Sequence, residues 1–297
     1  MENSTNTAQS FKDKWEKNSA LAFEYTLRED SDIAQWIVGR NGFTSFAEFG
    51  AHLAGCRRIL DGGCGNGRVT ALLRSLTDPA KTEVVGVDLV ASEVARKNLA
   101  GQPNVSLHAG DLLGDLSFLG KFDFIYCQEV LHHTANPKGG FLNLASLLAE
   151  NGELAVYVYK KKAPMREYAD DFIRDAIGPL PYGEAMKACE QVAELGRVLS
   201  ELNVKFTAPA VDLLGIEAGE YDVQRFLYHF FLKCFWNPDF GPHDNAVINY
   251  DWYHPQLCTR HTIDEILGWC ADAGLRVIHQ CVDHYGITVR AVRSDQG

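Results

Sequence analysis

The stretch Asp61-Gly62-Gly63-Cys64-Gly65-Asn66-Gly67 follows the short apolar run RRILD (57–61) and leads into an amphipathic segment at 69–76. Glycine lets the backbone turn sharply and approach a ligand closely, and the first N–H groups of the following helix offer unpaired donors. The next apolar run, EVVGVD (83–88), ends in Asp88, whose carboxylate can accept both hydroxyls of a ribose. This order predicts a nucleotide-type binding site. A tight turn with a solvated aspartate is the alternative.

Apolar runs and amphipathic stretches alternate from Arg58 to Tyr159. This alternation is typical of βαβ units, whose parallel sheet is covered by helices on both faces. Further strands are expected at VSLHAGD (105–111), FDFIYCQ (122–128) and ELAVYVY (153–159), and helices at about 69–76, 91–99 and 139–148.

The remainder of the chain follows other patterns. Two or three short helices are expected within 11–54, because apolar residues recur there at helical spacing. After Tyr159, helices are expected at 164–177, 184–202 and 220–236, followed by an aromatic-rich loop to about Cys258. A helix at 262–273 starts with a capping-box pattern, Thr262 and Glu265, and two β-like runs at 275–282 and 285–292 predict a terminal antiparallel hairpin.

Composition narrows the classes of function. The 297 residues carry 28 basic and 39 acidic side chains, a net charge of −11, which argues against a nucleic-acid binder. The first eighteen residues are polar, and no apolar run reaches the length of a membrane span, so neither a signal peptide nor a membrane segment is expected. Eight cysteines without a CxxC pair indicate reduced thiols in a cytoplasmic protein.

The order D-x-G-x-G-x-G differs from the dinucleotide fingerprint G-x-G-x-x-G and resembles motif I of the class I S-adenosylmethionine-dependent methyltransferases. Asp88-Leu89, Gly110-Asp111-Leu112 and the run FDFIYCQEVLHH (122–133) are similar to later motifs of that family, the last to its small-molecule branch. The resemblance covers residues 58–160 and 259–297.

The resemblance implies a Rossmann-like α/β fold, with a doubly wound, mostly parallel seven-stranded sheet in the order 3-2-1-4-5-7-6. It divides the chain into an N-terminal helical cap (1–57), the core (58–160 and 259–297) and a helical, aromatic-rich substrate lid inserted after strand 5 (161–258). It also implies S-adenosyl-L-methionine as cofactor, with Asp61 meeting its ammonium group and Asp111 its adenine. The implied cofactor contacts are Asp61, Gly63, Gly65, Gly67, Asp88, Leu89, Asp111, Leu112 and Gln128.

The fourth strand ends next to the switch point of the sheet, where ligands bind in such folds. His133 is the best candidate for a general base, since a neutral imidazole can accept a proton near pH 7. A histidine that bonds to the backbone is the alternative. Glu129 either binds a cationic acceptor or is solvated. In-line positioning of the reactants can contribute ~7 to 11 kcal/mol and a base only ~3 to 5 kcal/mol, so positioning should dominate.

The insertion is expected to complete the substrate pocket. Trp236, Tyr250, Trp252 and Tyr253 stand in a sequence that predicts a loop, where large rings favour a substrate wall or a cation–π contact. His254 and His261 are candidate bases. Other candidate substrate contacts are His132, the cations Lys160, Arg166 and Arg260, which could hold a carboxylate or phosphate, and Tyr25 and Arg28 of the N-terminal segment, which is expected to cover the cofactor.

Together these features predict an enzyme that transfers a methyl group to a nitrogen, oxygen, carbon or sulfur of a small metabolite, with an anionic acceptor one option. No metal is expected, because the spacing of His243, Asp251, His254 and His261 fits no ligand pattern. Neither a nucleic acid nor a membrane is expected as partner, and monomer and homodimer both remain open. The alternatives are another reaction of the same cofactor, cyclisation or aminocarboxypropyl transfer, and a non-catalytic cofactor-binding partner subunit.

Overall fold

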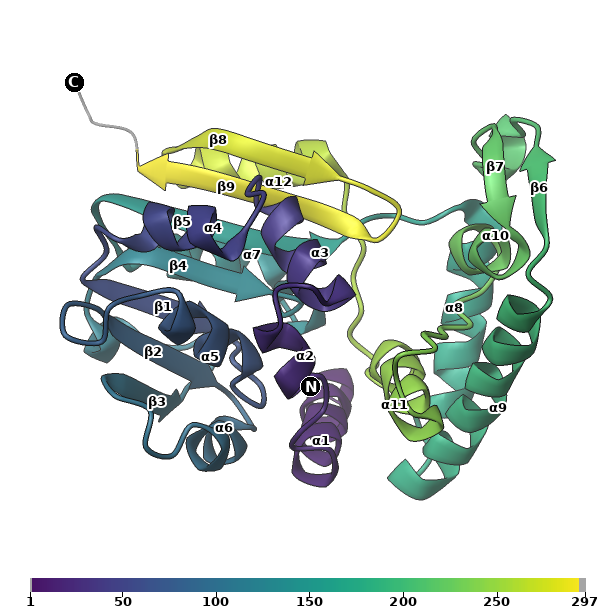
Figure 1. The fold of residues 1–297 in the computed structure, drawn as a ribbon, viewed down its shortest axis with the longest axis horizontal. Helices are drawn as coiled ribbons and strands as arrows, with labels where there is room; N and C mark the ends of the chain where they lie inside the picture. Colours follow the sequence, from purple (N-terminus) through teal and green to yellow (C-terminus); the bar gives the residue numbers. More distant parts are fainter. Residues whose placement is uncertain (1, 294–297) are drawn as a thin grey trace. The chain divides into compact units, whose positions relative to one another are not determined.

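The chain forms two compact units in the computed structural model, which describes residues 2–293 (Figure 1). The first, here called the core unit, comprises Trp15–Lys160 and the chain from Thr259 onward. The second, the lid unit, comprises Lys161–Cys258 and the chain up to Lys14.

The core unit is built on a seven-stranded sheet in the order β3-β2-β1-β4-β5-β9-β8. The five strands from β3 to β5 are parallel to one another, and β9 is antiparallel to both β5 and β8. Numbered within the sheet, this is the order 3-2-1-4-5-7-6, so the predicted fold is confirmed. The strands are β1 (Arg58–Gly62), β2 (Glu83–Asp88), β3 (Val105–Ala109), β4 (Phe122–Gln128), β5 (Leu148–Tyr159), β8 (Leu275–Val282) and β9 (Gly286–Arg293).

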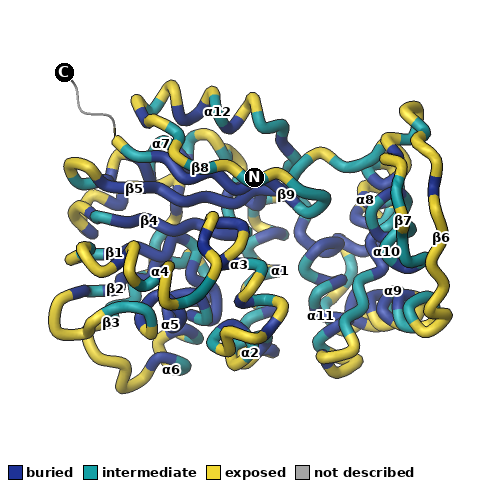
Figure 2. The backbone as a smooth tube through the Cα atoms, turned by 45° about the horizontal axis from the view of Figure 1, so that its top comes forward, coloured by how far each residue is buried: buried dark blue, intermediate teal, exposed yellow. Residues whose placement is uncertain are grey.

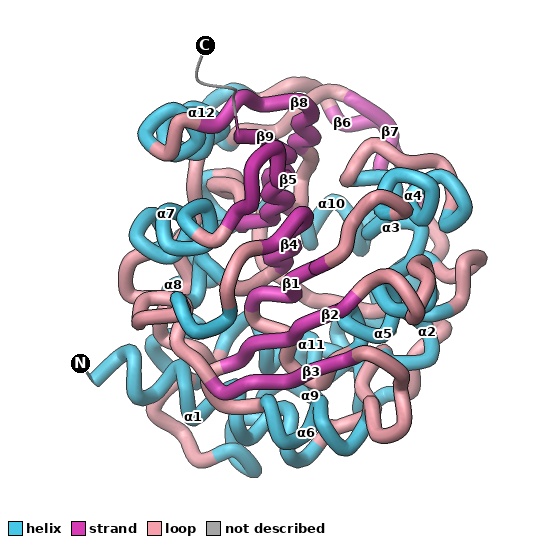
Figure 3. Tube along the Cα trace, turned by 90° about the vertical axis from the view of Figure 1, so that its left-hand side faces the viewer, coloured by secondary structure: helices cyan, strands magenta, loops and turns pink. Residues whose placement is uncertain are grey.

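Helices cover both faces of this sheet. Figure 3 shows α7 (Pro137–Ser146) and α12 (Ile263–Asp272) on one side of the strands, and α3 (Asp32–Arg40), α4 (Phe46–Leu53) and α5 (Arg68–Ser75) on the other. The strands β1, β4 and β5 are therefore buried along most of their length (Figure 2), which explains their nearly continuous apolar sequence. The shorter elements are α2 (Phe23–Leu27), α6 (Ser92–Asn98), η1 (Ser117–Leu119) and η2 (Leu131–His133).

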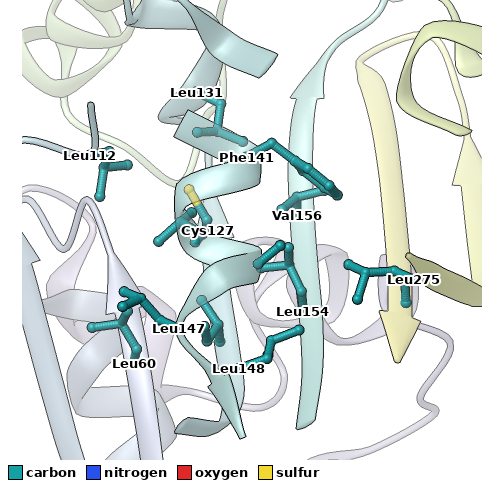
Figure 4. Close-up of a cluster of buried hydrophobic side chains, with 14 of the residues drawn as sticks. Leu60, Leu112, Cys127, Leu131, Phe141, Leu147, Leu148, Leu154, Val156 and Leu275 are labelled. Carbon is teal, nitrogen blue, oxygen red and sulfur yellow. The ribbon is translucent and has the colours of Figure 1, made fainter. Parts of the chain in front are cut away.

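Successive strand residues point to opposite faces, and this decides which side chains reach the core and which reach the site. Cys127 of β4 and Val156 of β5 pack beside Phe141 of α7 in the larger hydrophobic cluster (Figure 4). Tyr126 packs on the opposite face with residues of α3, α4 and α5. Gln128 is in phase with Tyr126 and therefore points to that second face.

The last helix and the terminal hairpin follow their sequence signals. Thr262 caps α12 in a complete capping box: its side chain accepts from the backbone of Glu265, whose side chain accepts in return from the backbone of Thr262. The strands β8 and β9 pair antiparallel, and both predictions are confirmed.

The lid unit is mainly helical. It contains α8 (Pro164–Ile177), α9 (Tyr182–Glu201), α10 (Val223–Phe230), α11 (Pro242–Tyr253) and the turn η3 (Asp212–Leu214). It also contains a small antiparallel hairpin, β6 (Lys205–Ala208) with β7 (Gly219–Asp222), in place of the start of the helix expected at 220–236.

The prediction of a loop up to Cys258 is wrong, because residues 242–253 form helix α11. Its Pro and Asn residues suggested a loop, but Pro242 stands in the first turn, where a missing N–H costs nothing. Asn245 and Asn249 are fully buried, and their side chains bond to the backbone of the preceding segment at Asn237 and Phe235. These asparagines hold an irregular segment against a helix.

The N-terminal segment also differs from the single cap expected at 1–57. It forms four helices, and the chain up to Lys14, most of α1 (Glu2–Lys17), belongs to the lid unit. Lys14 pairs there with Asp251 of α11, with 2.8 Å between Nζ and Oδ1, and Thr7 Oγ1 accepts from the backbone N–H of Leu257. From Trp15 onward the segment packs with the sheet as part of the core unit.

Candidate functional site

The glycine loop after β1 requires glycine for two physical reasons. Gly63 and Gly65 have φ values of +83° and +54°, a region that favours glycine. A Cβ on Gly63 would lie 2.4 Å from Cγ2 of Val130, and one on Gly65 would lie 2.9 Å from Cε2 of Trp15. Val130 and Trp15 therefore pack directly against the loop backbone at the carboxyl end of β1. Gly67 also has a positive φ and precedes α5 as its N-cap.

Asp88 is the last residue of β2 and forms a hydrogen bond with this loop. Its Oδ2 accepts from the backbone N–H of Gly65 at 3.0 Å, and its Oδ1 accepts from the N–H groups of Val90 and Ala91 at 2.9 and 2.8 Å. Each carboxylate oxygen can accept further bonds, so the group is held in place while it can still receive ligand hydroxyls. The side chain of the neighbouring Leu89 is 56% exposed and therefore not part of the core.

Asp61 lies at the buried end of β1. Its carboxylate is 2% exposed and accepts from Oγ1 of Thr70 at 2.6 Å. The pKa of Asp61 is raised to about 7, mainly by burial; the hydrogen bond from Thr70 opposes this increase and the charge of Asp88 adds to it. This acid therefore changes its charge near neutral pH.

The remaining predicted cofactor contacts differ in exposure. Asp111 is exposed after β3, where its Oδ1 accepts from the N–H of Leu113. Leu112 instead packs into the core cluster shown in Figure 4, so its side chain supports the fold. Gln128 is buried at the end of β4, and its Oε1 accepts from the hydroxyl of Tyr126.

Two histidines pack against Tyr159 where β4 and β5 end. The rings of His132 and Tyr159 are parallel within 28° at 3.6 Å, and His133 meets Tyr159 edge-on at 5.6 Å. Nδ1 of His132 accepts from the backbone N–H of Tyr159. The backbone carbonyl of His132 accepts from both the N–H and the hydroxyl of Thr259. Both histidines are buried, and the predicted base lies among these rings.

Glu129 follows β4 with a φ of +60°, a strained conformation for a residue with a side chain and one that concentrates at functional sites. Its Oε2 lies 3.3 Å from Nη2 of Arg68, which also donates to Oγ1 of Thr26. The carboxylate therefore pairs with Arg68, and its predicted contact with a cationic acceptor stays a prediction. Sequence reasoning missed Arg68, although its place directly after the glycine loop was a signal.

His261 lies beside the end of β5, and its predicted role as a base stays a prediction. Its ring is buried, bonds through Nε2 with Oγ1 of Thr259 at 2.9 Å and meets Trp269 edge-on. Its backbone N–H donates to the carbonyl of Tyr159, which extends the edge of the sheet beside Lys160. Lys160 and Arg260 are half-buried on this segment.

Tyr25 and Arg28 lie at α2 in the core unit. The Arg28 guanidinium sits 5.3 Å from the Tyr25 ring, and its side chain is more than half exposed. They pack on each other near the surface, so their predicted contact with a ligand stays a prediction.

His254 belongs to the lid unit, and the structure contradicts its prediction as a base. Nδ1 bonds with Oγ of Ser10 at 2.7 Å, Nε2 bonds with the carbonyl of Leu180 at 2.9 Å, and the ring stacks on Tyr250 at 4.5 Å. Burial lowers the pKa of the His254 imidazole. Both nitrogens are thus engaged in holding the lid unit together.

Arg166 is likewise an internal residue of the lid unit and not a rim cation. Its Nε donates to Oδ2 of Asp170 at 2.6 Å, and its guanidinium lies 5.1 Å from the ring of Trp252. Tyr253 donates to Oδ1 of Asp170 and to the carbonyl of Lys233. The predicted wall of loop aromatics is therefore wrong for three of its members, because Tyr250, Trp252 and Tyr253 are buried on α11. Trp236 is half-buried between α10 and α11.

Within residues 2–293, no group of three or more His, Cys, Asp or Glu side chains could hold a metal ion. Over that range no helix has both the length and the apolar character needed to cross a membrane.

The family comparison agrees with the loop and the sheet. Residues 60–154 match the family model described as a methyltransferase domain. Residues 60–154 form a methyltransferase domain. The prediction of a methyltransferase is thereby confirmed for this domain.

Relatives of the methyltransferase domain match only part of the chain in sequence. Over 111 residues the chain is 39% identical to an uncharacterized protein of Synechococcus sp., a match that covers 34% of this chain and 25% of that protein. The chain thus spans about a quarter of the length of the curated relative it matches.

Two solved structures with the methyltransferase fold are similar to the chain. PKMT2 from Rickettsia typhi, in complex with AdoHcy, gives a TM-score of 0.52 at 16% identity over 81% of this chain and 49% of that one. Magnesium protoporphyrin IX methyltransferase from Synechocystis PCC 6803, with bound SAH, gives a TM-score of 0.47 at 15% identity, over 98% and 100% of the two chains. The first likeness confirms the fold.

Proposed function

We propose that this protein transfers a methyl group from S-adenosylmethionine to a nitrogen, oxygen, carbon or sulfur atom of a small metabolite. The observation that carries the proposal is the pairing of the glycine loop with Asp88, whose carboxylate accepts from Gly65 at the carboxyl edge of the sheet. A loop and an acid in this arrangement fit a ligand that brings polar groups to the loop and ribose hydroxyls to the acid.

The residues present fit the cofactor. Gly63 and Gly65 adopt the positive φ values of a tight loop, which a residue with a side chain would strain. Asp61 offers a carboxylate for the ammonium group, Asp88 accepts the ribose hydroxyls, and exposed Asp111 accepts from the adenine amino group. When bound, S-adenosylmethionine supplies an electrophilic methyl group on a sulfonium.

The chain contributes mainly by holding the acceptor in line, which can supply ~7 to 11 kcal/mol of the barrier. Of the two histidines after β4, we propose His133 as the base. His132 uses Nδ1 to accept from the backbone of Tyr159, so its neutral ring carries the proton on Nε2 and cannot take another at Nδ1 without breaking that bond. A base would add about 10² to 10⁴ in rate.

We also propose that the lid unit selects the acceptor. Arg166, Tyr253 and His254 are buried inside the lid unit. Selection of the acceptor would therefore depend on the surface of the lid unit rather than on these side chains. Lys160, half-buried at the end of β5, is the cation of the core unit proposed to meet an anionic acceptor. The free thiols of the eight cysteines favour a reducing compartment such as the cytoplasm.

The first test is binding of S-adenosylhomocysteine, which we expect at micromolar affinity and with a defined pH dependence. Asp61 is protonated below its pKa of about 7 and attracts the ammonium group only when ionised. Affinity should therefore rise through pH 7 and fall by up to about tenfold per pH unit on the acid side. Titration calorimetry between pH 5.5 and 8.5 measures this.

Asp61→Asn should bind more weakly at pH 8 and lose most of the pH dependence, whereas Asp115→Asn, on an exposed aspartate of the same unit, should retain both. If the wild type fails to bind at any pH, the proposed function is wrong. If Asp61→Asn keeps the full pH dependence, Asp61 does not meet the ammonium group.

A further inference from the structure

Three buried polar atoms of the core unit have no hydrogen-bond partner among the residues that the structure describes. They are Nη2 of Arg40, Oδ1 of Asn41 and Nε2 of Gln128. All three side chains are at least nine-tenths buried. Folded proteins leave few buried polar atoms unpaired, and each exception calls for an explanation such as a bound group.

The three side chains belong to one connected cluster. Nδ2 of Asn41 donates to the hydroxyl of Tyr126 at 3.2 Å, and that hydroxyl donates to Oε1 of Gln128. Gln128 pairs in register with Tyr157 on the neighbouring strand, and the Arg40 guanidinium lies 4.3 Å from the Tyr157 ring. The cluster therefore occupies the α3 side of the sheet where β4 and β5 end, at the edge that carries Asp61 and the glycine loop.

Each side chain is held by its other polar atoms. Arg40 donates from Nε to Thr288 at 2.9 Å and from Nη1 to Asp283, and its guanidinium also faces the ring of Trp36 at 4.8 Å. Asn41 donates to the carbonyl of Ile37 at 2.8 Å as well as to Tyr126. The unpaired atoms are therefore fixed in advance, as the atoms of a binding site need to be.

The charges of this region are balanced without a ligand. Asp283 faces Arg40, and the neighbouring Arg290 bonds to Glu153 and to the carbonyl of Asn41. His52 bonds to that same Glu153. A further anion would meet no surplus of positive charge, so the missing group is a neutral polar one.

Two donors and one acceptor are the complement of a hydroxyl, which accepts with two lone pairs and donates one proton. We propose that Arg40, Asn41 and Gln128 bind a hydroxyl group of the methyl acceptor. A guanidinium and two amides are not general bases, so none of these side chains can remove the hydroxyl proton. This hydroxyl anchors the acceptor, and the atom that is methylated is a different one.

The inference rests on the proposed function and narrows its substrate class to small metabolites that carry a hydroxyl beside the nucleophilic atom. A site built to bond a hydroxyl discriminates strongly against the analogue that lacks it, because its own polar groups are then left unpaired. Discrimination between matched probes is therefore the property to measure.

The experiment uses the full-length protein saturated with S-adenosylhomocysteine and three probes of one ring size: phenol, anisole and toluene. We expect phenol to shift the side-chain amide NMR signals of Gln128 and to bind at least tenfold more tightly than toluene. Anisole, which keeps the oxygen but lacks the proton that Asn41 would accept, should bind more weakly than phenol.

Gln128→Leu and Gln128→Met should each abolish the preference for phenol, measured with each variant saturated with S-adenosylhomocysteine. Gln128→Met keeps the length of the side chain and removes its polar atoms, so it covers the case in which Gln128→Leu fails to fold. Gln280→Leu, at an exposed glutamine of β8 in the same unit, is the matched control and should keep the preference.

Equal binding of phenol and toluene, or an undiminished preference in both Gln128 variants, would overturn the hydroxyl site. So would a crystal structure of the phenol complex in which a water molecule bonds all three atoms and phenol lies elsewhere. Failure of the wild type to bind S-adenosylhomocysteine would instead count against the proposed function itself.

Discussion

Asp88→Ala is expected to weaken S-adenosylhomocysteine binding by roughly 10² to 10⁴-fold. The carboxylate would accept two ribose hydroxyls, and hydrogen bonds to a charged group contribute about 1.5 to 3 kcal/mol each. It also accepts from the backbone N–H groups of Gly65, Val90 and Ala91, so its removal frees the loop as well. Calorimetry at pH 8 measures the loss.

Asp115→Ala is the control for Asp88→Ala. Asp115 is an exposed aspartate of the same unit that also accepts from a backbone N–H, that of Ser117 at 2.9 Å. Its removal should leave the affinity for S-adenosylhomocysteine unchanged. An Asp88→Ala protein that folds and binds within threefold of the wild type would contradict the role of Asp88.

Arg166→Ala is expected to destabilise the protein by about 3 to 5 kcal/mol. Removing one partner of a buried ion pair leaves the other charge uncompensated, and here Asp170 is fully buried on the same helix. The change also removes the guanidinium that packs against Trp252 and Tyr228. Urea denaturation measures the free energy of unfolding.

The matched control is Arg197→Ala, which removes exposed ion pairs with Glu194 and Glu201 on α9 and should leave stability unchanged. Unaltered stability of Arg166→Ala, together with a lost affinity for an anionic acceptor, would restore the interpretation of Arg166 as a substrate contact.

The core unit was predictable because its signals are local. The apolar runs, the glycine loop and Asp88 follow one another in the sequence, and the capping box spans only the four residues from Thr262 to Glu265. Strand order within the sheet came from the resemblance to a family, not from the pattern of residues.

The lid unit was less predictable because α8 reverses the usual amphipathic pattern. Arg166, Asp170 and Arg174 point inward at helical spacing, whereas Met165, Tyr168 and Phe172 are exposed. A charged residue after a strand suggests a solvated rim, and nothing nearby in the sequence reveals the partners Tyr253 and Tyr228. The aromatics of α11 were misassigned for the same reason: their partners lie far along the chain.

The cluster around Arg40 could not be found from the sequence either. Its partners Tyr157, Asp283 and Thr288 come from β5 and the terminal hairpin, more than a hundred residues away. Only the alternation in FDFIYCQ, which sets Tyr126 and Gln128 on one face, was a local signal.

The most direct test of methyl transfer supplies the protein with methyl-labelled S-adenosylmethionine and an extract of the producing cells. We predict a labelled small molecule that carries a hydroxyl, with S-adenosylhomocysteine released in equal amount, and neither product with the Asp88→Ala protein. Release of methylthioadenosine, or no label transferred by a protein that binds the cofactor, would contradict a methyltransferase.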